Sequence, residues 1–213
     1  GLITQRSNMV AVIISQQTNL YYPEVLFQLT QRFSERGIRV LLFTLEHEGD
    51  IDSILEKILQ YRVDGIVTAA MLSAAQVKTI ENAHIPVIFY NRTLREILVN
   101  SVRCDQEEGE RWLVGELFAA GHRKFAIVSG PEDSPVSAER TTGALLKLRE
   151  LGIEDATIVR GDFGYQSGRH AITSLMRTRD RAPDAIIVAN DAMAIGVVDE
   201  IREGFKLRVP EDV

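Results

Sequence analysis

Short runs rich in valine and isoleucine alternate with longer amphipathic stretches along most of this chain. Residues 9–15 (MVAVIIS) form a continuous apolar run, which is typical of a strand buried on both faces. Residues 50–61 instead carry isoleucine and leucine at helical spacing, so that one helix face is apolar. Gly37 follows the stretch 23–35, as a glycine often follows the end of a helix.

The same alternation continues to residue 203 and predicts an α/β fold. It predicts strands at residues 9–15, 40–45, 65–69, 86–90, 101–104, 124–130, 156–161 and 184–190, and helices at residues 23–35, 50–61, 73–83, 107–120, 137–151, 165–177 and 192–203. Strands separated by helices indicate βαβ units and a mostly parallel sheet. We therefore expect doubly wound sheets.

The pattern restarts after Gly121, which predicts two similar lobes. We expect the end of a linker at residues 1–8, a first lobe at residues 9–121 and a second lobe at residues 122–213. The second lobe shows about three clear strands, and the chain stops at VPEDV where another strand is due. We therefore expect a further C-terminal segment that is missing here.

Polar residues that follow the predicted strands are the candidate ligand contacts. Parallel sheets of this kind bind ligands at the carboxyl ends of their strands. In the first lobe these residues are Ser15, Gln16, Gln17, Thr68, Asn91 and Arg92, and in the second they are residues 130–137, Asp162, Phe163, Asn190 and Asp191. Aromatic rings at Tyr21, Tyr22, Tyr90 and Phe163 add stacking surfaces, which suit a sugar or a nucleobase. Ordinary loop and cap residues would account for about half of these positions.

Four of the candidates have alternative roles that the sequence leaves open. Arg140 lies early in a predicted helix. It either grips a hydroxyl pair or a carboxylate of a ligand, or lies at the surface and pairs with Glu139 or Glu110. Asn190 and Asp191 either cap the following helix or contact a ligand. Asp105 presents the same choice ahead of the helix at residues 107–120.

The composition and charge of the chain argue against several classes of function. The net charge is -6 and the basic residues are scattered, so DNA binding by this segment alone is not expected. Cys104 has no partner for a disulfide, which suits a reducing cytoplasm, and no apolar run reaches the ~20 residues of a membrane span. Enzyme motifs and metal-ligand spacings are missing, so we expect neither an enzyme nor a cofactor or metal.

Several segments together resemble the effector-binding core of the LacI/GalR family of bacterial transcription regulators. They are QRSNMVAVIIS, NLYYPEVLFQLTQRFSERGIRVLLFT, YRVDGIVTA, IPVIFYNR, VRCDQEEGERWLVGELFAAGHRKFAIVSGP, SAERTTGALLKLRELGI, GDFGYQSGRHAITSLM and DAIIVANDAMAIGVVDEIREGFKLRVPEDV. The resemblance covers nearly the whole chain in order. It implies the type I periplasmic-binding-protein-like fold, with a ligand cleft between the two lobes.

The resemblance also implies site residues and partners. It matches Tyr21 and Tyr22 to an aromatic pair, Asp105 to an acidic residue, Arg140 to the cleft arginine, Phe163 to a stacking aromatic, and Asn190 with Asp191 to an Asn-Asp pair. Asn91-Arg92 departs from the commoner Asp-Arg, and Asn19-Leu20-Tyr21-Tyr22 departs from Asn-Pro-Phe-Phe, so no particular sugar is implied. The family pattern implies a homodimer and an upstream helix-turn-helix domain that binds operator DNA.

The resulting hypothesis is a cytoplasmic transcription regulator whose effector is a sugar, phosphosugar or nucleobase. A periplasmic solute receptor of the same fold is the alternative, and an upstream secretory leader in place of a helix-turn-helix pattern would identify it. An enzyme on a doubly wound sheet is the third possibility, which turnover of a bound ligand would reveal.

Overall fold

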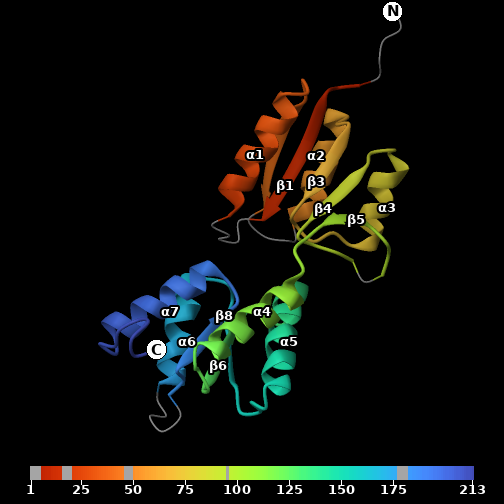
Figure 1. The fold of residues 1–213 in the computed structure, drawn as a ribbon. Coiled ribbons are helices and arrows are strands. Elements are labelled where there is room, and N and C mark those ends of the chain that lie inside the picture. Colours follow the sequence, from red (N-terminus) through yellow and green to blue (C-terminus); the bar gives the residue numbers. More distant parts are fainter. Residues whose placement is uncertain (1–5, 16–20, 46–49, 95, 177–181) are drawn as a thin grey trace, which may run out of the picture. The chain divides into compact units, whose positions relative to one another are not determined.

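The computed structural model describes residues 6–15, 21–45, 50–94, 96–176 and 182–213. The described residues form two compact units, one ending at Cys104 and the other beginning at Asp105. Each predicted strand and helix is present within about two residues of its expected bounds. The α/β fold class with two parallel-sheet units is therefore confirmed, and each unit is drawn in Figure 1.

Unit 1 is built on a five-stranded sheet in the order β2-β1-β3-β4-β5. All four strand pairs are parallel. Its elements are β1 (Met9–Ser15), α1 (Tyr22–Ser34), β2 (Arg39–Leu45), α2 (Ile51–Tyr61), β3 (Gly65–Thr68), α3 (Ala74–Asn82), β4 (Val87–Tyr90) and β5 (Asn100–Val102).

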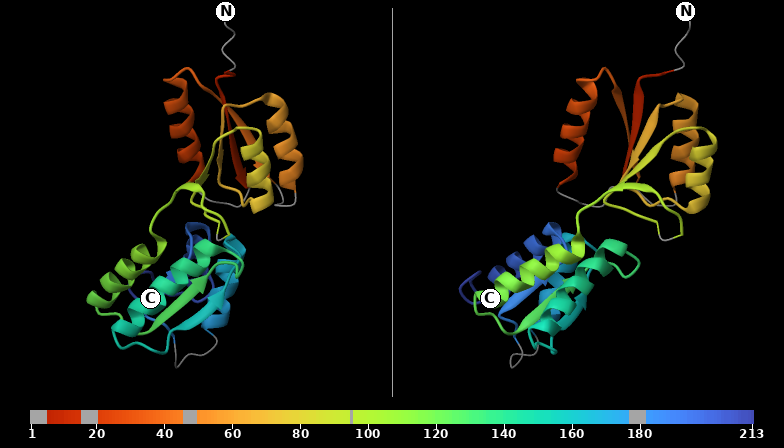
Figure 2. Two further views of the ribbon diagram at one scale, coloured as in Figure 1. Left: turned by 90° about the vertical axis from the view of Figure 1, so that its right-hand side faces the viewer. Right: turned by 45° about the vertical axis from the view of Figure 1, so that its right-hand side comes forward.

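The core of unit 1 lies between the sheet and helices α2 and α3. The apolar face predicted for residues 50–61 is buried, because Ile58 is fully covered and Ile54 is nearly so. Helix α3 begins with a capping box in which Ser73 and Gln76 satisfy each other's backbone amides. Figure 2 shows α1 alone on the opposite side of the sheet.

Unit 2 has a three-stranded parallel sheet in the order β7-β6-β8. Its elements are α4 (Gln106–Ala119), β6 (Phe125–Ser129), α5 (Pro135–Glu150), β7 (Thr157–Arg160), α6 (Tyr165–Leu175), β8 (Ala185–Val188) and α7 (Asp191–Glu203). One core lies under α6 and α7 and another under α4 and α5, so both faces of this sheet are covered.

The division between the units falls ahead of α4, whereas the junction was expected near Gly121. Helix α4 belongs to unit 2 because its Val114 is fully buried in the core that contains Phe125 and Ile127. The helix follows the last strand of unit 1 in the sequence, so a strand-helix pattern by itself assigns it to the preceding unit. Tertiary packing reverses that assignment.

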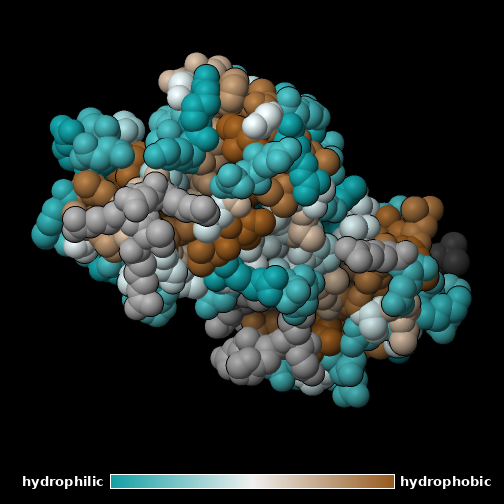
Figure 3. Space-filling view, turned by 90° about the horizontal axis from the view of Figure 1, so that it is seen from below, coloured by the Kyte–Doolittle hydropathy of each residue, from teal (hydrophilic) through white to brown (hydrophobic). Residues whose placement is uncertain are grey.

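Apolar side chains also reach the surface, and on the face drawn in Figure 3 they lie among polar ones. Trp112 of α4 and Phe27 of α1 are both more than half exposed. None of the described helices combines the length with the apolar character that a membrane span requires.

Candidate functional site

Arg140 is held in place at the carboxyl end of the unit 2 sheet. It lies in the second turn of α5, where its Nε donates a hydrogen bond of 2.8 Å to Oε1 of Gln106 on α4. Its Nη1 donates to the carbonyl oxygen of Ala189, directly after β8. The guanidinium is thus oriented by two neighbouring elements of the same unit, which fixes its direction before any ligand arrives.

Asn190 links the end of β8 to the loop after β7. Its Oδ1 accepts a hydrogen bond of 3.0 Å from the amide of Met193 and so caps α7. Its Nδ2 donates a bond of 2.8 Å to the carbonyl oxygen of Phe163. The cap that the sequence left as an alternative is therefore formed, and it places Arg140, Asn190 and Phe163 along one edge of the sheet.

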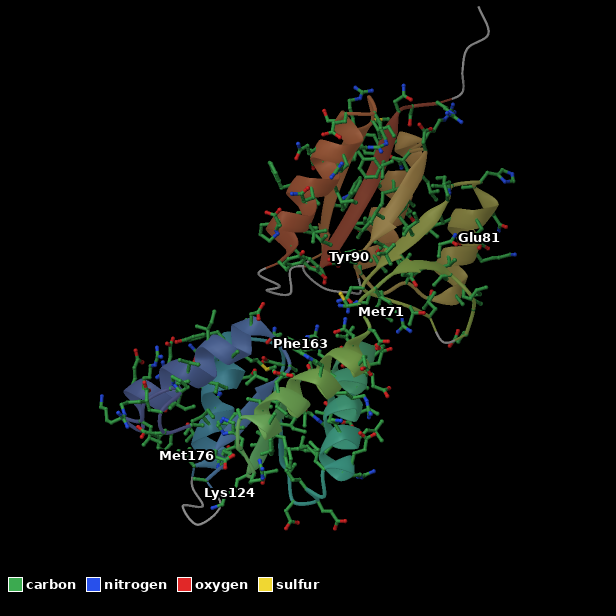
Figure 4. The ribbon with its side chains drawn as sticks, in the orientation of Figure 1. Met71, Glu81, Tyr90, Lys124, Phe163 and Met176 are labelled. Atoms are coloured by element: carbon green, nitrogen blue, oxygen red, sulfur yellow. The ribbon has the colours of Figure 1, made fainter. Side chains whose placement is uncertain are left out.

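Phe163 has a backbone conformation that aromatic residues rarely adopt, with φ of 69°. Its ring lies over Gly130 at the end of β6, because a Cβ atom at Gly130 would come within 2.2 Å of that ring. Figure 4 labels Phe163 at this edge. Such strain is found preferentially at functional sites, so the observed φ supports Phe163 as a site residue.

Glu110 lies on α4, and the sequence suggested it only as a partner of Arg140. Its Oε2 is buried and has no hydrogen-bond partner among the described residues. Burial raises the pKa of Glu110, and the positive charge of Arg140 partly opposes that rise. Gln106, Glu110 and Val114 follow one another at intervals of four residues, so they share one face of α4.

The remaining acidic candidates of unit 2 lie at the beginnings of helices. Asp105 accepts a hydrogen bond of 3.1 Å from the amide of Glu108 and caps α4, and Asp191 is the first residue of α7. Hydrogen bonds from the Ser167 hydroxyl and the Gly164 amide lower the pKa of Asp162. Asp105 therefore also takes the cap role that the sequence left open.

Two strand ends of unit 1 carry buried hydroxyl groups. Ser15 at the end of β1 is buried, and Thr68 at the end of β3 is fully buried. The Thr68 hydroxyl accepts a bond of 3.2 Å from the amide of Ala70, so it serves the local turn. Gln16, Gln17, Asn19 and Leu20 lie outside the described residues.

Two tyrosines of unit 1 border a small apolar hollow between α1 and the sheet. Tyr22 is the first residue of α1, and Tyr90 ends β4, where Figure 4 labels it. Burial raises the pKa of both phenols, and nearby Arg92 partly offsets the rise at Tyr22. Tyr21 is 59% exposed. The aromatic pair is therefore split into one buried ring and one exposed ring.

Asn91 and Arg92 follow β4 directly. Asn91 has a left-handed φ of 53°, which asparagine tolerates better than most residues, and its amide donates to the carbonyl of Val102 at 2.8 Å. Arg92 Nη1 donates to the Asn91 carbonyl at 3.4 Å, and its buried Nε has no partner among the described residues. Tyr22 and Tyr90 line one hollow of unit 1, and the charge of Arg92 acts on Tyr22.

Gln106 is a site residue that was not predicted from the sequence. Gln106 is buried, with 8% of its surface exposed. Its Oε1 accepts the hydrogen bond that holds Arg140 in place. The four-residue spacing of Gln106, Glu110 and Val114 was available in the sequence, but polar residues at a helix start are usually solvated. Within the described ranges, no group of three or more His, Cys, Asp or Glu side chains is placed to hold a metal ion.

The family described as periplasmic binding proteins and the sugar binding domain of the LacI family matches residues 7–213 of this chain. The HTH-type transcriptional regulator AscG of Escherichia coli (strain K12) is 32% identical over 199 residues, which are 91% of this chain and 59% of that protein. The chain spans 65% of the length of two further regulators, from Priestia megaterium and Thermobifida fusca. It therefore covers less than two thirds of these curated relatives.

Two solved structures share the fold and are similar in sequence. A sugar-binding transcriptional regulator of the LacI family from Escherichia coli, complexed with phosphate, superposes with a TM-score of 0.81 at 29% identity, over 98% of this chain and 77% of that one. A complex of the transcriptional regulator CelR with cellobiose gives a TM-score of 0.85 at 28% identity, over 98% of this chain and 66% of that one.

Proposed function

Because the chain belongs to the family of periplasmic binding proteins and LacI-family sugar-binding domains, we propose that it is the effector-binding core of a bacterial transcription regulator. The resemblance inferred from the sequence is confirmed by this membership. The similar full-length proteins are named as HTH-type regulators, which favours a regulator over a periplasmic solute receptor. They also favour a binding protein over an enzyme. We place the protein in the cytoplasm, where such a regulator meets DNA.

The observation that carries the proposal is the linked set of Arg140, Asn190 and Phe163 at the strand ends of unit 2. The guanidinium and amide offer donors in fixed directions, and the ring of Phe163 offers an apolar face. Hydroxyl groups around a sugar ring need such donors, while the ring's C–H surface packs on an aromatic face. Tyr22, Tyr90 and Arg92 of unit 1 form the second candidate surface.

In this proposal, the effector binds one arrangement of the protein more tightly than another and thereby shifts the equilibrium between them. The protein acts as a homodimer, and an upstream helix-turn-helix domain of each subunit contacts one half of a palindromic operator. The coupling between effector and operator is then a free energy of about 1–3 kcal/mol, which corresponds to a change of about 5–150-fold in affinity.

The proposal is tested with the full-length protein in two steps. Thermal unfolding is measured with a series of sugars, phosphosugars and nucleobases, because a ligand that binds only the native state raises its stability. Fluorescence anisotropy then measures the affinity for operator DNA with and without each ligand that stabilises the protein. A ligand that leaves operator affinity unchanged would contradict the regulatory role, and turnover of the ligand would indicate an enzyme.

The site itself is tested by Arg140→Ala. Removing a partly buried guanidinium that donates to a ligand typically costs about 2–5 kcal/mol of binding free energy, so we expect a loss of at least about 30-fold. Arg149→Ala is the matched control, because Arg149 is an exposed residue in the last turn of the same helix. Unchanged ligand affinity in Arg140→Ala, measured by calorimetry, would remove Arg140 from the site.

A further inference from the structure

The carboxylate of Asp64 holds the chain just ahead of β1. Its Oδ1 accepts a hydrogen bond of 3.1 Å from the amide of Ser7, and its Oδ2 accepts one of 2.7 Å from the amide of Asn8. Asp64 directly precedes β3, so these bonds join residues 57 and 56 positions apart. Hydrogen bonds to an ionised carboxylate are roughly twice as strong as bonds between neutral groups. This one side chain therefore attaches two residues outside β1 to a distant part of unit 1.

Backbone hydrogen bonds complete the attachment from both sides. The sheet order places β1 between β2 and β3. The amide of Arg39, the first residue of β2, donates to the Asn8 carbonyl at 2.8 Å, and the amide of Asp64 donates to the Met9 carbonyl at 2.7 Å. The carboxylate of Asp64 thus extends the pairing of the sheet by two residues beyond Met9, where β1 begins.

The chain changes direction at the attached residues. In an extended strand, successive amides point to opposite sides, whereas the amides of Ser7 and Asn8 both point to one carboxylate. Asn8 has a left-handed φ of 53°, a conformation that asparagine adopts more readily than most residues. The Oγ atom of Ser7 is covered by neighbouring atoms, so the segment lies against unit 1. Contacts with distant elements therefore fix the direction from which the chain reaches β1.

We propose that Asp64 is an anchor that sets the direction of the chain ahead of β1, and with it the position from which a DNA-binding domain reaches the operator. The inference rests on the proposed function, which places that domain upstream. Two domains on rigid anchors are held at one separation in a dimer, so they bind together only to half-sites at the matching spacing. Asp64 acts through Ser7 and Asn8 and is thus a positioning residue. Its loss lets each domain swing, which widens the range of spacings that the protein tolerates.

The anchor itself is tested by limited trypsin digestion of the full-length protein, with the fragments measured by mass spectrometry. Trypsin cleaves after Arg6, which is exposed, and the bond it cuts contains the Ser7 amide that Asp64 binds. The protease reaches this bond when the anchor opens. In Asp64→Ala we expect cleavage after Arg6 to become about tenfold faster, because two hydrogen bonds to a charged group are lost. Asp64→Asn keeps one acceptor oxygen, so its rate should rise by about threefold.

Cleavage after Arg36 is the internal reference, because Arg36 is an exposed residue of the same unit that follows α1. Its rate should be the same in wild type and Asp64→Ala. Asp50→Ala is the matched control variant, because it removes the same charge from an exposed residue whose side chain makes no cap hydrogen bond. It should leave both rates unchanged. An unchanged rate after Arg6 in Asp64→Ala, or an equal rise after Arg36, would overturn the anchor.

The consequence for DNA binding is tested with a palindromic duplex that the full-length wild type selects from random-sequence DNA. Fluorescence anisotropy compares this duplex with one that carries two extra base pairs between its half-sites. The insertion should weaken binding by at least about tenfold in wild type but by no more than about threefold in Asp64→Ala. A duplex with a single half-site should bind equally to both proteins, because the DNA-binding domain itself is unaltered.

The outcomes of the DNA experiment separate this inference from the proposed function. If the insertion weakens wild type and Asp64→Ala equally, the positioning role of Asp64 is overturned while the proposed regulator stands. Weaker binding of Asp64→Ala to the single half-site would indicate general damage to the protein and would also overturn that role. If the wild type selects no palindromic DNA, the proposed function is rejected, and the inference with it.

Discussion

The two units differ in how completely their sheets are covered. In unit 2 each face of the sheet packs on a pair of helices, and each face has its own buried core. In unit 1 the described core lies on the face that packs against α2 and α3. On the opposite face Ile88 is 43% exposed and Val102 is 63% exposed, although both are apolar residues within strands.

The widths of strands and helices explain why the two sheets are covered to different extents. Strands lie about 4.8 Å apart and a helix with its side chains is about 10 Å wide, so one helix covers about two strands. Two helices per face are enough for the three strands of unit 2, whereas α1 alone leaves part of a five-stranded sheet uncovered (Figure 2). The number of strands relative to the number of helices therefore decides which apolar faces become core.

The largest effect is expected for Phe89→Ala in unit 1. Phe89 is fully buried on the α2/α3 face, so its truncation should lower the free energy of unfolding by about 3–5 kcal/mol. Ile88→Ala alters the next residue of the same strand on the other face, where truncation should cost only about 1 kcal/mol. Urea denaturation compares the two variants. Equal losses would show that the α1 face is as well packed as the core.

A smaller effect is expected where two helices of unit 2 approach each other. A Cβ atom at Gly196 of α7 would lie 2.1 Å from the carbonyl oxygen of Tyr165 on α6, so Gly196→Ala forces the helices apart. We expect a loss of about 1–3 kcal/mol in thermal or chemical unfolding.

Gly109→Ala in α4 is the control for this substitution. Outside the backbone of its own helix, no atom of the described residues lies within 4 Å of a Cβ built at Gly109. The change should therefore stabilise the protein by up to about 1 kcal/mol through helix propensity. If Gly196→Ala were as well tolerated as Gly109→Ala, the close approach of α6 and α7 would not be needed for the stability of unit 2.

The smallest effect concerns the pH dependence of unit 2. Because burial raises the pKa of Glu110 in the folded state, the folded protein holds this proton more tightly than the unfolded chain does. The free energy of unfolding should therefore fall as the pH rises from the ordinary glutamate value through the raised folded value. Glu110→Gln removes this fall, so its stability relative to wild type should increase over that range.

Asp162 should affect the pH dependence of stability in the opposite direction to Glu110. Its pKa is lowered by hydrogen bonds, so its contribution to stability is present above the ordinary aspartate value and is lost as the pH falls through the lowered one. Asp162→Asn should flatten the acid limb, whereas Glu110→Gln should alter the profile at higher pH. Chemical denaturation at a series of pH values separates the two, and the same profile in both variants would contradict these assignments.

The secondary structure followed closely from local patterns. The run at residues 9–15 is the strand β1, and the apolar stripe of residues 50–61 became the buried face of α2, because period and burial agree in both segments. For helix α4, local patterns do not predict which unit the helix packs in. Its position in the sequence suggested the first lobe, but Val114 packs in unit 2, and only contacts with residues far along the chain decide that.

For the candidate site, the sequence by itself determined which polar and aromatic residues follow the strands, since parallel strands bring their carboxyl ends to one edge. Only the tertiary structure decided that Arg140 bonds to Gln106 and the Ala189 carbonyl, and that Asn190 holds the Phe163 loop. These bonds join residues 27 to 49 positions apart. Local patterns extend over a few residues, whereas the direction of a side chain depends on which distant elements pack around it.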